Sequence, residues 1–134
     1  MDTPLREETP VVAGVLWRQG RFLAVRRPEG KPLAGFWEFP GGKTAPCETL
    51  EQALVREFQE ELGVTPRDVR YWKALRHEYG HLTVRLHFFH IHAAQGEPTP
   101  LEGQTLAWLT PSQALDYQFL PADQDVIHEL DAFC

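Results

Sequence analysis

Three glutamates, Glu57, Glu60 and Glu61, lie within one segment of helical periodicity. With Glu57 at zero on a wheel turning about 100° per residue, Glu61 lies at roughly 40° and Glu60 at roughly 300°. The three carboxylates therefore occupy one arc of the predicted helix. Carboxylate oxygens suit hard cations, so this arc is a candidate site for Mg²⁺ or Mn²⁺.

A solvated acidic face is the alternative interpretation of the same arc. The apolar stripe of the helix falls between about 60° and 160° on the wheel and consists of Leu54, Val55, Phe58 and Leu62. A solvated face should lie opposite this stripe, and only Glu60 does. Glu57 and Glu61 repel each other at a spacing of four residues, and no Lys or Arg four residues away relieves them. The geometry alone leaves both interpretations open.

The boundaries of this helix are encoded locally. Thr49, with Gln52 three residues later, forms a capping box, and Gly63 followed by Pro66 predicts an end at Leu62. Runs typical of strands occupy residues 11–17, 21–27, 36–39, 69–78, 82–92 and 105–109. A helical turn is expected at 111–115 and a final helix at 121–133, with a buried side formed by Ile127, Leu130 and Phe133. This mixture indicates an α/β or α+β fold with helices on both faces of the sheet.

Length and composition limit the classes of protein that fit. With 134 residues, 43 % of them hydrophobic, the chain suits one domain with a substantial core. A net charge of −6 disfavours binding to duplex nucleic acid, which needs a basic face. No apolar run approaches the ~20 residues of a membrane helix, no secretory signal is visible, and two cysteines exclude a disulfide framework. We expect a single cytoplasmic domain spanning residues 1–134, in which residues 1–9 form a flexible N-terminal segment.

The segment around the glutamates follows a longer pattern. From Gly42 it reads GKTAPCETLEQALVREFQEELGV, in which Glu48 follows Gly42 after five residues and REFQEELGV begins at Arg56. Every fixed position of the Nudix box is filled, so the chain resembles the Nudix family. The resemblance implies the Nudix fold, a mixed β-sheet sandwiched between α-helices, with a catalytic divalent metal held at the box.

The resemblance also implies a role for each residue of the box. Its metal ligands would be Glu57, Glu60, Glu61 and the backbone carbonyl of Gly41 or Gly42. Glu48, bonded to Arg56, would support the loop before the helix, and Gly63 would support the box from the other end. Arg56 can form a fork to a carboxylate and is placed among the catalytic residues with these glutamates.

Outside the box, the chain resembles the MutT-like nucleoside triphosphate pyrophosphohydrolases. By this resemblance Arg27 contacts a substrate phosphate, Glu102 serves as an additional metal ligand or as a base, and Asp123 reads the nucleobase. Phe39 and Leu86 complete the set expected to bind substrate.

The reaction implied is Mg²⁺-dependent hydrolysis of a nucleoside triphosphate to a monophosphate and pyrophosphate, with Mn²⁺ as the substitute ion. Oxidised nucleotides such as 8-oxo-dGTP are the expected substrates, which would make the protein a sanitiser of the nucleotide pool. Either Glu57 or Glu102 would accept the proton of the attacking water. The alternatives are a pyrophosphohydrolase of CTP or dCTP and a non-catalytic nucleotide-binding module. We expect a monomer or homodimer whose partner is a small nucleotide, with no duplex and no membrane.

Asp123 departs from the MutT type that reads 8-oxoguanine, in which the equivalent residue is asparagine. An ionised aspartate only accepts hydrogen bonds, so it would favour bases that present amino or ring N–H donors. The alternative is that Asp123 merely favours the helix dipole in the first turn of the last helix. The sequence therefore leaves the preferred base open.

Other suggestive residues are interpreted as structural. Residues 77–81 spell H-E-x-x-H, a zinc protease motif, but that chemistry needs a helix and this segment lies between two predicted strands. His87, His90 and His92 fall on a strand and are expected at the surface or along a cleft, and Cys47 is expected to be an exposed thiol. Residues expected in the core or in the wall of a cleft are Trp37, Trp72 and Trp108.

Overall fold

The computed structural model describes residues 8–79 and 81–133. In chain order its elements are β1 (Glu8–Arg18), β2 (Arg21–Arg26), β3 (Trp37–Glu38), β4 (Gly41–Lys43), α1 (Leu50–Leu62), β5 (Thr65–Tyr79), β6 (Leu82–Gln95), β7 (Thr105–Leu109), α2 (Pro111–Ala114), α3 (Pro121–Glu129) and the 3₁₀ helix η1 (Leu130–Phe133). Glu8 and Thr9, expected in a flexible segment, belong to β1, and residues 1–7 lie outside the described part. No helix among the described residues is long and apolar enough to cross a membrane.

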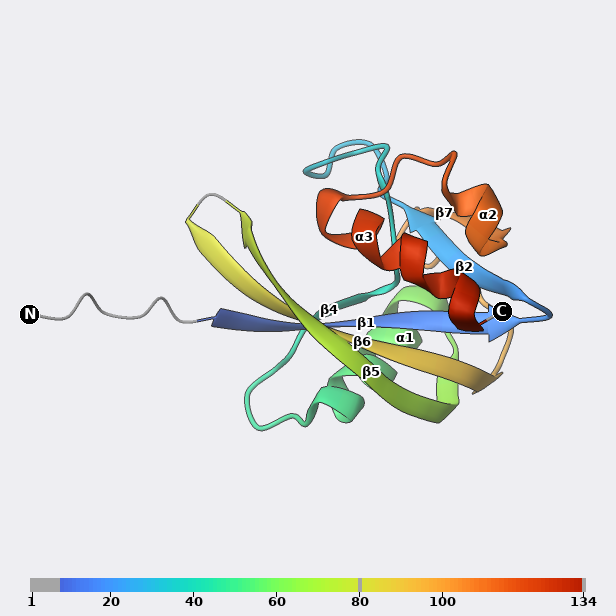
Figure 1. Cartoon of the computed structure of the whole chain (residues 1–134). Coiled ribbons are helices and arrows are strands. Elements are labelled where there is room, and N and C mark those ends of the chain that lie inside the picture. Colours follow the sequence, from blue (N-terminus) through green and yellow to red (C-terminus); the bar gives the residue numbers. More distant parts are fainter. Residues whose placement is uncertain (1–7, 80, 134) are drawn as a thin grey trace, which may run out of the picture.

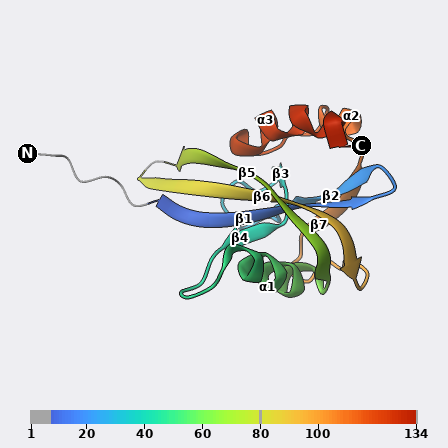
Figure 2. The same ribbon diagram turned by 60° about the horizontal axis from the view of Figure 1, so that its bottom comes forward.

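The described strands form one mixed sheet between layers of helix (Figure 1, Figure 2). The main path through the sheet is β3-β2-β1-β6-β5, with β4 paired to β1 and β7 paired to β2. β1 and β6 run parallel, whereas the other pairs of strands are antiparallel. α1 covers one face of the sheet and α3 covers the other, as Figure 2 shows. The predicted fold class is therefore confirmed.

α1 begins and ends where the sequence predicts. The Thr49 hydroxyl accepts a hydrogen bond from the Gln52 backbone N–H at 3.1 Å, and the Thr49 N–H donates to the Gln52 side chain at 2.9 Å. Gly63 adopts a φ of 70°, and its N–H donates to the Gln59 carbonyl at 3.0 Å. These local groups fix the length of the helix that carries the acidic residues.

Three of the four residues of the predicted apolar stripe pack in the core, whereas Val55 is only partly buried. Leu54, Phe58 and Leu62 are fully buried in the core on that face. β1 lets the helix approach closely at Gly14, where a Cβ atom would lie 2.6 Å from the Phe58 ring. Because this stripe is fixed, Glu57 and Glu61 beside it are held next to the sheet, whereas Glu60 remains exposed.

β4 is a strand that the sequence does not predict. β3 ends before Pro40-Gly41-Gly42, as the sequence predicts, but Gly41–Lys43 then pairs antiparallel with Val11–Ala13 of β1. A Cβ atom at Gly41 would lie 1.9 Å from the Val12 carbonyl oxygen, so glycine permits an approach of the two backbones that no other residue allows. This pairing carries the start of the box onto the middle of the sheet.

The last helix and the long hairpin differ from expectation in their lengths. The helix predicted at 121–133 is α3 followed by η1; Ile127 and Leu130 are buried, and the Phe133 side chain lies outside the described part. β5 and β6 are longer than predicted, and β5 accommodates Pro66 because it is an edge strand with an irregular register there.

The expectation for one of the histidines is wrong. His90 is 4 % exposed and accepts a hydrogen bond at its Nδ1 from the Trp17 indole N–H at 2.8 Å. β5 passes through His77 and ends at Tyr79, and His81 lies in a turn, so the described part of the H-E-x-x-H segment contains no helix. Cys47 is exposed, as predicted. Residues that pack against the two cores are Trp37, Trp72 and Trp108.

Candidate active site

A cavity of about 410 Å³ brings most of the predicted site residues together. Predicted residues that line it are Arg27, Phe39, Gly41, Gly42, Glu57, Glu61, Leu86, Glu102 and Asp123. Those outside its lining are Glu48, Arg56, Glu60 and Gly63. The cavity is lined by residues of β1, β2, β3, β4, α1, β6 and α3 and of the loops before β3, β7 and α3, so no short stretch of sequence contains it.

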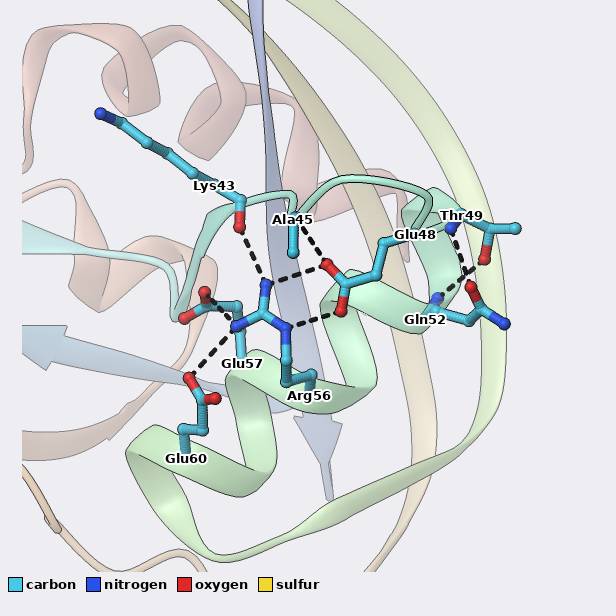
Figure 3. Close-up of polar contacts among 8 residues, drawn as sticks. All are labelled: Lys43, Ala45, Glu48, Thr49, Gln52, Arg56, Glu57 and Glu60. Atoms are coloured by element: carbon cyan, nitrogen blue, oxygen red, sulfur yellow. Dashed lines mark hydrogen bonds and ion pairs between the residues drawn. The ribbon is translucent and has the colours of Figure 1, made fainter.

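Arg56 organises the start of α1 (Figure 3). Its guanidinium donates to both oxygens of Glu48, at 2.6 and 3.0 Å, and to the Lys43 carbonyl at 3.0 Å. It also donates to Glu57 at 2.9 Å and to Glu60 at 3.2 Å. The pairing of Glu48 with Arg56 that the resemblance implied is thus present. These hydrogen bonds hold the pKa of Glu48 below its usual range.

Gly42 allows the Glu57 side chain to lie directly over β4. A Cβ atom at Gly42 would lie 2.6 Å from the Glu57 carboxyl carbon, which is closer than two such atoms can approach. The Glu57 side chain is 16 % exposed and is fixed by Arg56 on its other side. The absence of a side chain at Gly42 therefore leaves the space that the Glu57 carboxylate occupies.

Glu61 lies in an environment that suits the binding of a cation. One of its carboxylate oxygens, Oε2, is buried without a hydrogen-bond partner. Burial, assisted by the negative charges of Glu57 and Glu102, raises the pKa of Glu61 to about 9. An orphaned oxygen among mutually repelling carboxylates fits a hard divalent ion, which would satisfy the oxygen and neutralise the charges.

The carboxylates are not closed into a cage. Among the described residues, no group of three or more His, Cys, Asp or Glu side chains is arranged to hold a metal ion. Two of the predicted ligands, Glu57 and Glu60, are ion-paired with Arg56, and the Glu60 side chain is 56 % exposed. Glu57 and Glu60 are thus held by Arg56 in the metal-free protein.

Asp123 differs from the ionised residue considered in the sequence. It is 5 % exposed, and burial raises its pKa well above the usual range, assisted by the charge of Glu38. A hydrogen bond from the backbone of Phe39 opposes this shift without cancelling it. Burial therefore favours the neutral form of this carboxyl group, and a neutral acid both donates and accepts hydrogen bonds, whereas an ionised aspartate only accepts.

Sequence reasoning identified Arg27 but missed the charged residues that accompany it in the cavity, Glu38, Lys31 and Lys43. Arg27 donates to Glu38 at 3.0 and 3.2 Å and to the Pro32 carbonyl at 2.8 Å, so its guanidinium is already engaged. Burial raises the pKa of Glu38, and Arg27 opposes that shift. Lys31 and Lys43 also line the cavity. Only the alternation of charge around residues 26–43 could have signalled this group.

Comparison with known proteins agrees with this site. Residues 11–129 match the NUDIX domain family. The chain belongs to the Nudix family. This Nudix protein is 40 % identical over 123 residues to a CTP pyrophosphohydrolase of Escherichia coli, covering 92 % of this chain and 89 % of the relative. It is 37 % identical over 122 residues to an 8-oxo-dGTP diphosphatase of Haemophilus influenzae, covering 90 % and 89 % respectively.

The fold agrees with a solved relative over nearly the whole chain. A structure of MutT, from work on Aliivibrio salmonicida and Vibrio cholerae, matches with a TM-score of 0.84 and 31 % identity, covering 94 % of this chain and 98 % of that one. The protein is a Nudix hydrolase, an enzyme that hydrolyses phosphorus anhydrides. Nudix hydrolases in general use divalent metal ions.

Proposed function

We propose that this Nudix hydrolase cleaves nucleoside triphosphates to monophosphate and pyrophosphate in the presence of Mg²⁺. The observation that supports the proposal is a single cavity lined by two carboxylates of the box helix and by cationic side chains. Glu57 and Glu61 line it together with Arg27, Lys31 and Lys43. A triphosphate carries several negative charges, and these must be neutralised before a nucleophile can approach.

The roles of the residues follow from their places in the cavity. Glu57, Glu60, Glu61, Glu102 and the carbonyl of Gly41 or Gly42 would hold the ion. When bound, Mg²⁺ neutralises phosphate charge and lowers the pKa of a coordinated water.

The proton of the attacking water needs an acceptor close to the ion. Glu57 and Glu102 both line the cavity and are the two candidates. Arg56 holds Glu57 and Glu60 in place, and Lys43 and Arg27 would bind phosphate oxygens.

Oxidised purines are the favoured substrates. A neutral Asp123 offers one O–H donor and one carbonyl acceptor, which is the pair that the asparagine of the resembled 8-oxoguanine readers offers. The relatives named 8-oxo-dGTP diphosphatase support this choice. The reaction would then remove oxidised nucleotides from the cytoplasmic pool, with a free nucleotide and not a duplex as partner.

Cytosine nucleotides are the second candidate substrates. The specific observation in their favour is the 40 % identity to a CTP pyrophosphohydrolase. The same Asp123 carboxyl, once deprotonated, would accept the exocyclic amine of cytosine.

Pyrophosphate release with Mg²⁺ tests the proposal across 8-oxo-dGTP, dGTP, CTP, dCTP, 5-methyl-dCTP and 2-hydroxy-dATP. We expect kcat/KM for 8-oxo-dGTP to exceed that for dGTP by about 100-fold or more, as hydrogen-bond readout allows. Preference for CTP or dCTP would select the second candidate. If the protein binds these nucleotides but releases pyrophosphate from none of them, it is a nucleotide-binding module.

A further inference from the structure

Gln104 joins two glutamates, one in α1 and one in the loop before β7. Its side-chain Oε1 accepts a hydrogen bond from the backbone N–H of Glu102 at 2.8 Å. Its Nε2 donates to the backbone carbonyl of Glu61, at the end of α1, at 3.2 Å. Gln104 is buried and lines the same cavity as both glutamates. Each end of its amide is therefore used, one on each backbone.

The turn between the two residues is built for this contact. Gly103, between Glu102 and Gln104, has a φ of 75°, a left-handed conformation that favours glycine. This conformation folds the chain back, so that the Gln104 side chain reaches the N–H two residues before it. The Glu102 backbone is thereby fixed relative to α1.

Attachment of the loop does not depend on Gln104. The Thr99 N–H donates to the Leu62 carbonyl at 2.9 Å, and the Leu101 N–H donates to the Glu61 carbonyl at 3.1 Å. These two backbone bonds already hold the segment before β7 on the end of α1. What the Gln104 side chain adds is a hydrogen bond at Glu102 itself, the residue whose carboxylate acts electrostatically on Glu61.

We propose that Gln104 is a positioning residue, which sets the Glu102 carboxylate toward a divalent ion shared with Glu61. This inference rests on the proposed function only in taking Glu102 as part of the ion site. Residues that hold a metal ligand in place typically change metal affinity or activity by about 10- to 100-fold when they are replaced.

A Mn²⁺ titration, followed by the EPR signal of the free ion and carried out without nucleotide, tests this role. Gln104→Met keeps the length of the side chain and loses both hydrogen bonds. We expect it to weaken Mn²⁺ binding about tenfold. In the Glu102→Gln background the same exchange should have almost no effect, because Gln104 acts through Glu102. The wild-type pyrophosphate assay is independent of this result, so failure of one is distinguishable from failure of the other.

Thr99→Val provides the matched control. It removes a hydrogen bond of 3.1 Å from the Thr99 hydroxyl to the Glu97 carbonyl in the same segment, and it should leave Mn²⁺ affinity unchanged. Should Gln104→Met not fold, Gln104→Asn takes its place, because its amide is too short to reach both partners, and the same direction is expected. Wild-type Mn²⁺ affinity in the folded Gln104 variant overturns the proposal. So does a tenfold loss that persists undiminished in the Glu102→Gln background.

Discussion

The guanidinium of Arg56 donates hydrogen bonds to both carboxylate oxygens of Glu48, with Nε 2.6 Å from Oε2 and Nη2 3.0 Å from Oε1. Glu48 in turn accepts a hydrogen bond from the Ala45 N–H at 2.7 Å, so the loop before α1 is tied to the first half of that helix. The remaining Arg56 donor, Nη1, serves Glu57 and Glu60. One side chain therefore positions the loop and restrains two acidic groups of the site.

Arg56→Lys should show whether these two roles depend on the shape of the guanidinium or only on its positive charge. Lysine carries the same charge but has no planar fork, so it cannot hold Glu48 and the Lys43 carbonyl together while serving Glu57. We expect kcat for the best nucleotide to fall about 10- to 100-fold, with a lower Tm. Arg70→Lys, at an exposed ion pair with Asp68, is the control and should change neither value. Wild-type kcat in Arg56→Lys would show that charge alone suffices.

Glu61→Gln should remove stabilisation by Mg²⁺ and leave the metal-free protein intact. The metal-free Glu61 carboxyl, with a pKa of about 9, is already neutral at neutral pH, so an amide of the same shape changes little. Wild-type protein should gain about 2.7 kcal/mol at a Mg²⁺ concentration 100 times Kd, and the variant should not. Thermal unfolding with EDTA or Mg²⁺ measures both. Glu51→Gln, at an exposed position of α1, should retain the full shift.

The same carboxyl makes Mg²⁺ affinity depend on pH. Below its pKa of about 9, Glu61 binds a proton that the ion must displace. We expect the apparent affinity to rise with pH, by at most about tenfold per pH unit, and to level off near the pKa. A calorimetric titration in two buffers of different ionisation enthalpy would detect the released proton. An affinity that is independent of pH would contradict the assignment of Glu61 to the ion site.

Local signals explain which parts of the structure the sequence predicts. Thr49, Gln52 and Gly63 cap α1 through neighbours within a few residues, so both ends of that helix can be read directly. β4 exists because Gly41 fits against Val12, a contact that depends on the register of distant strands. The sequence contains no local sign of that register, which is why β4 was missed.

The raised pKa of Asp123 was missed for a related reason. It depends on burial and on Glu38, which is far away along the chain. The partner of Arg27 within the cavity is also visible only once β2 and β3 are paired. Residue types and spacing thus identify the acidic end of the site, whereas protonation states require the assembled cavity.

His90 should make stability depend on pH in a specific window. Burial lowers its pKa to about 4, whereas an unfolded chain has a histidine pKa of about 6.5. Between these values the unfolded chain binds the proton and the folded protein does not, so this contribution is complete above about pH 6.5 and declines as pH falls toward 4. The loss reaches about 3 kcal/mol.

Carboxyl groups with raised pKa values change the stability with pH in the opposite direction. The contribution of His90 is therefore measured as the difference in stability between wild type and a His90 variant. His90→Gln keeps an acceptor for the Trp17 indole and does not titrate. Urea unfolding at two pH values should show that wild type loses more stability than the variant on going from pH 7 to 5. His128→Gln, on the exposed side of α3, should follow wild type. Equal losses in wild type and His90→Gln would contradict a depressed histidine pKa.

Asp123→Asn distinguishes a neutral from an ionised base-reading acid. If the carboxyl donates and accepts as a neutral acid, the amide offers the same pair, and kcat/KM for 8-oxo-dGTP should stay within about threefold of wild type. Asp123→Ala removes both groups and should lower kcat/KM by about 10- to 100-fold. Asp125→Asn, on the exposed side of the same helix, is the control. A loss in Asp123→Asn as large as that in Asp123→Ala would show that the bound base needs the carboxylate, and preference for cytosine nucleotides should then accompany it.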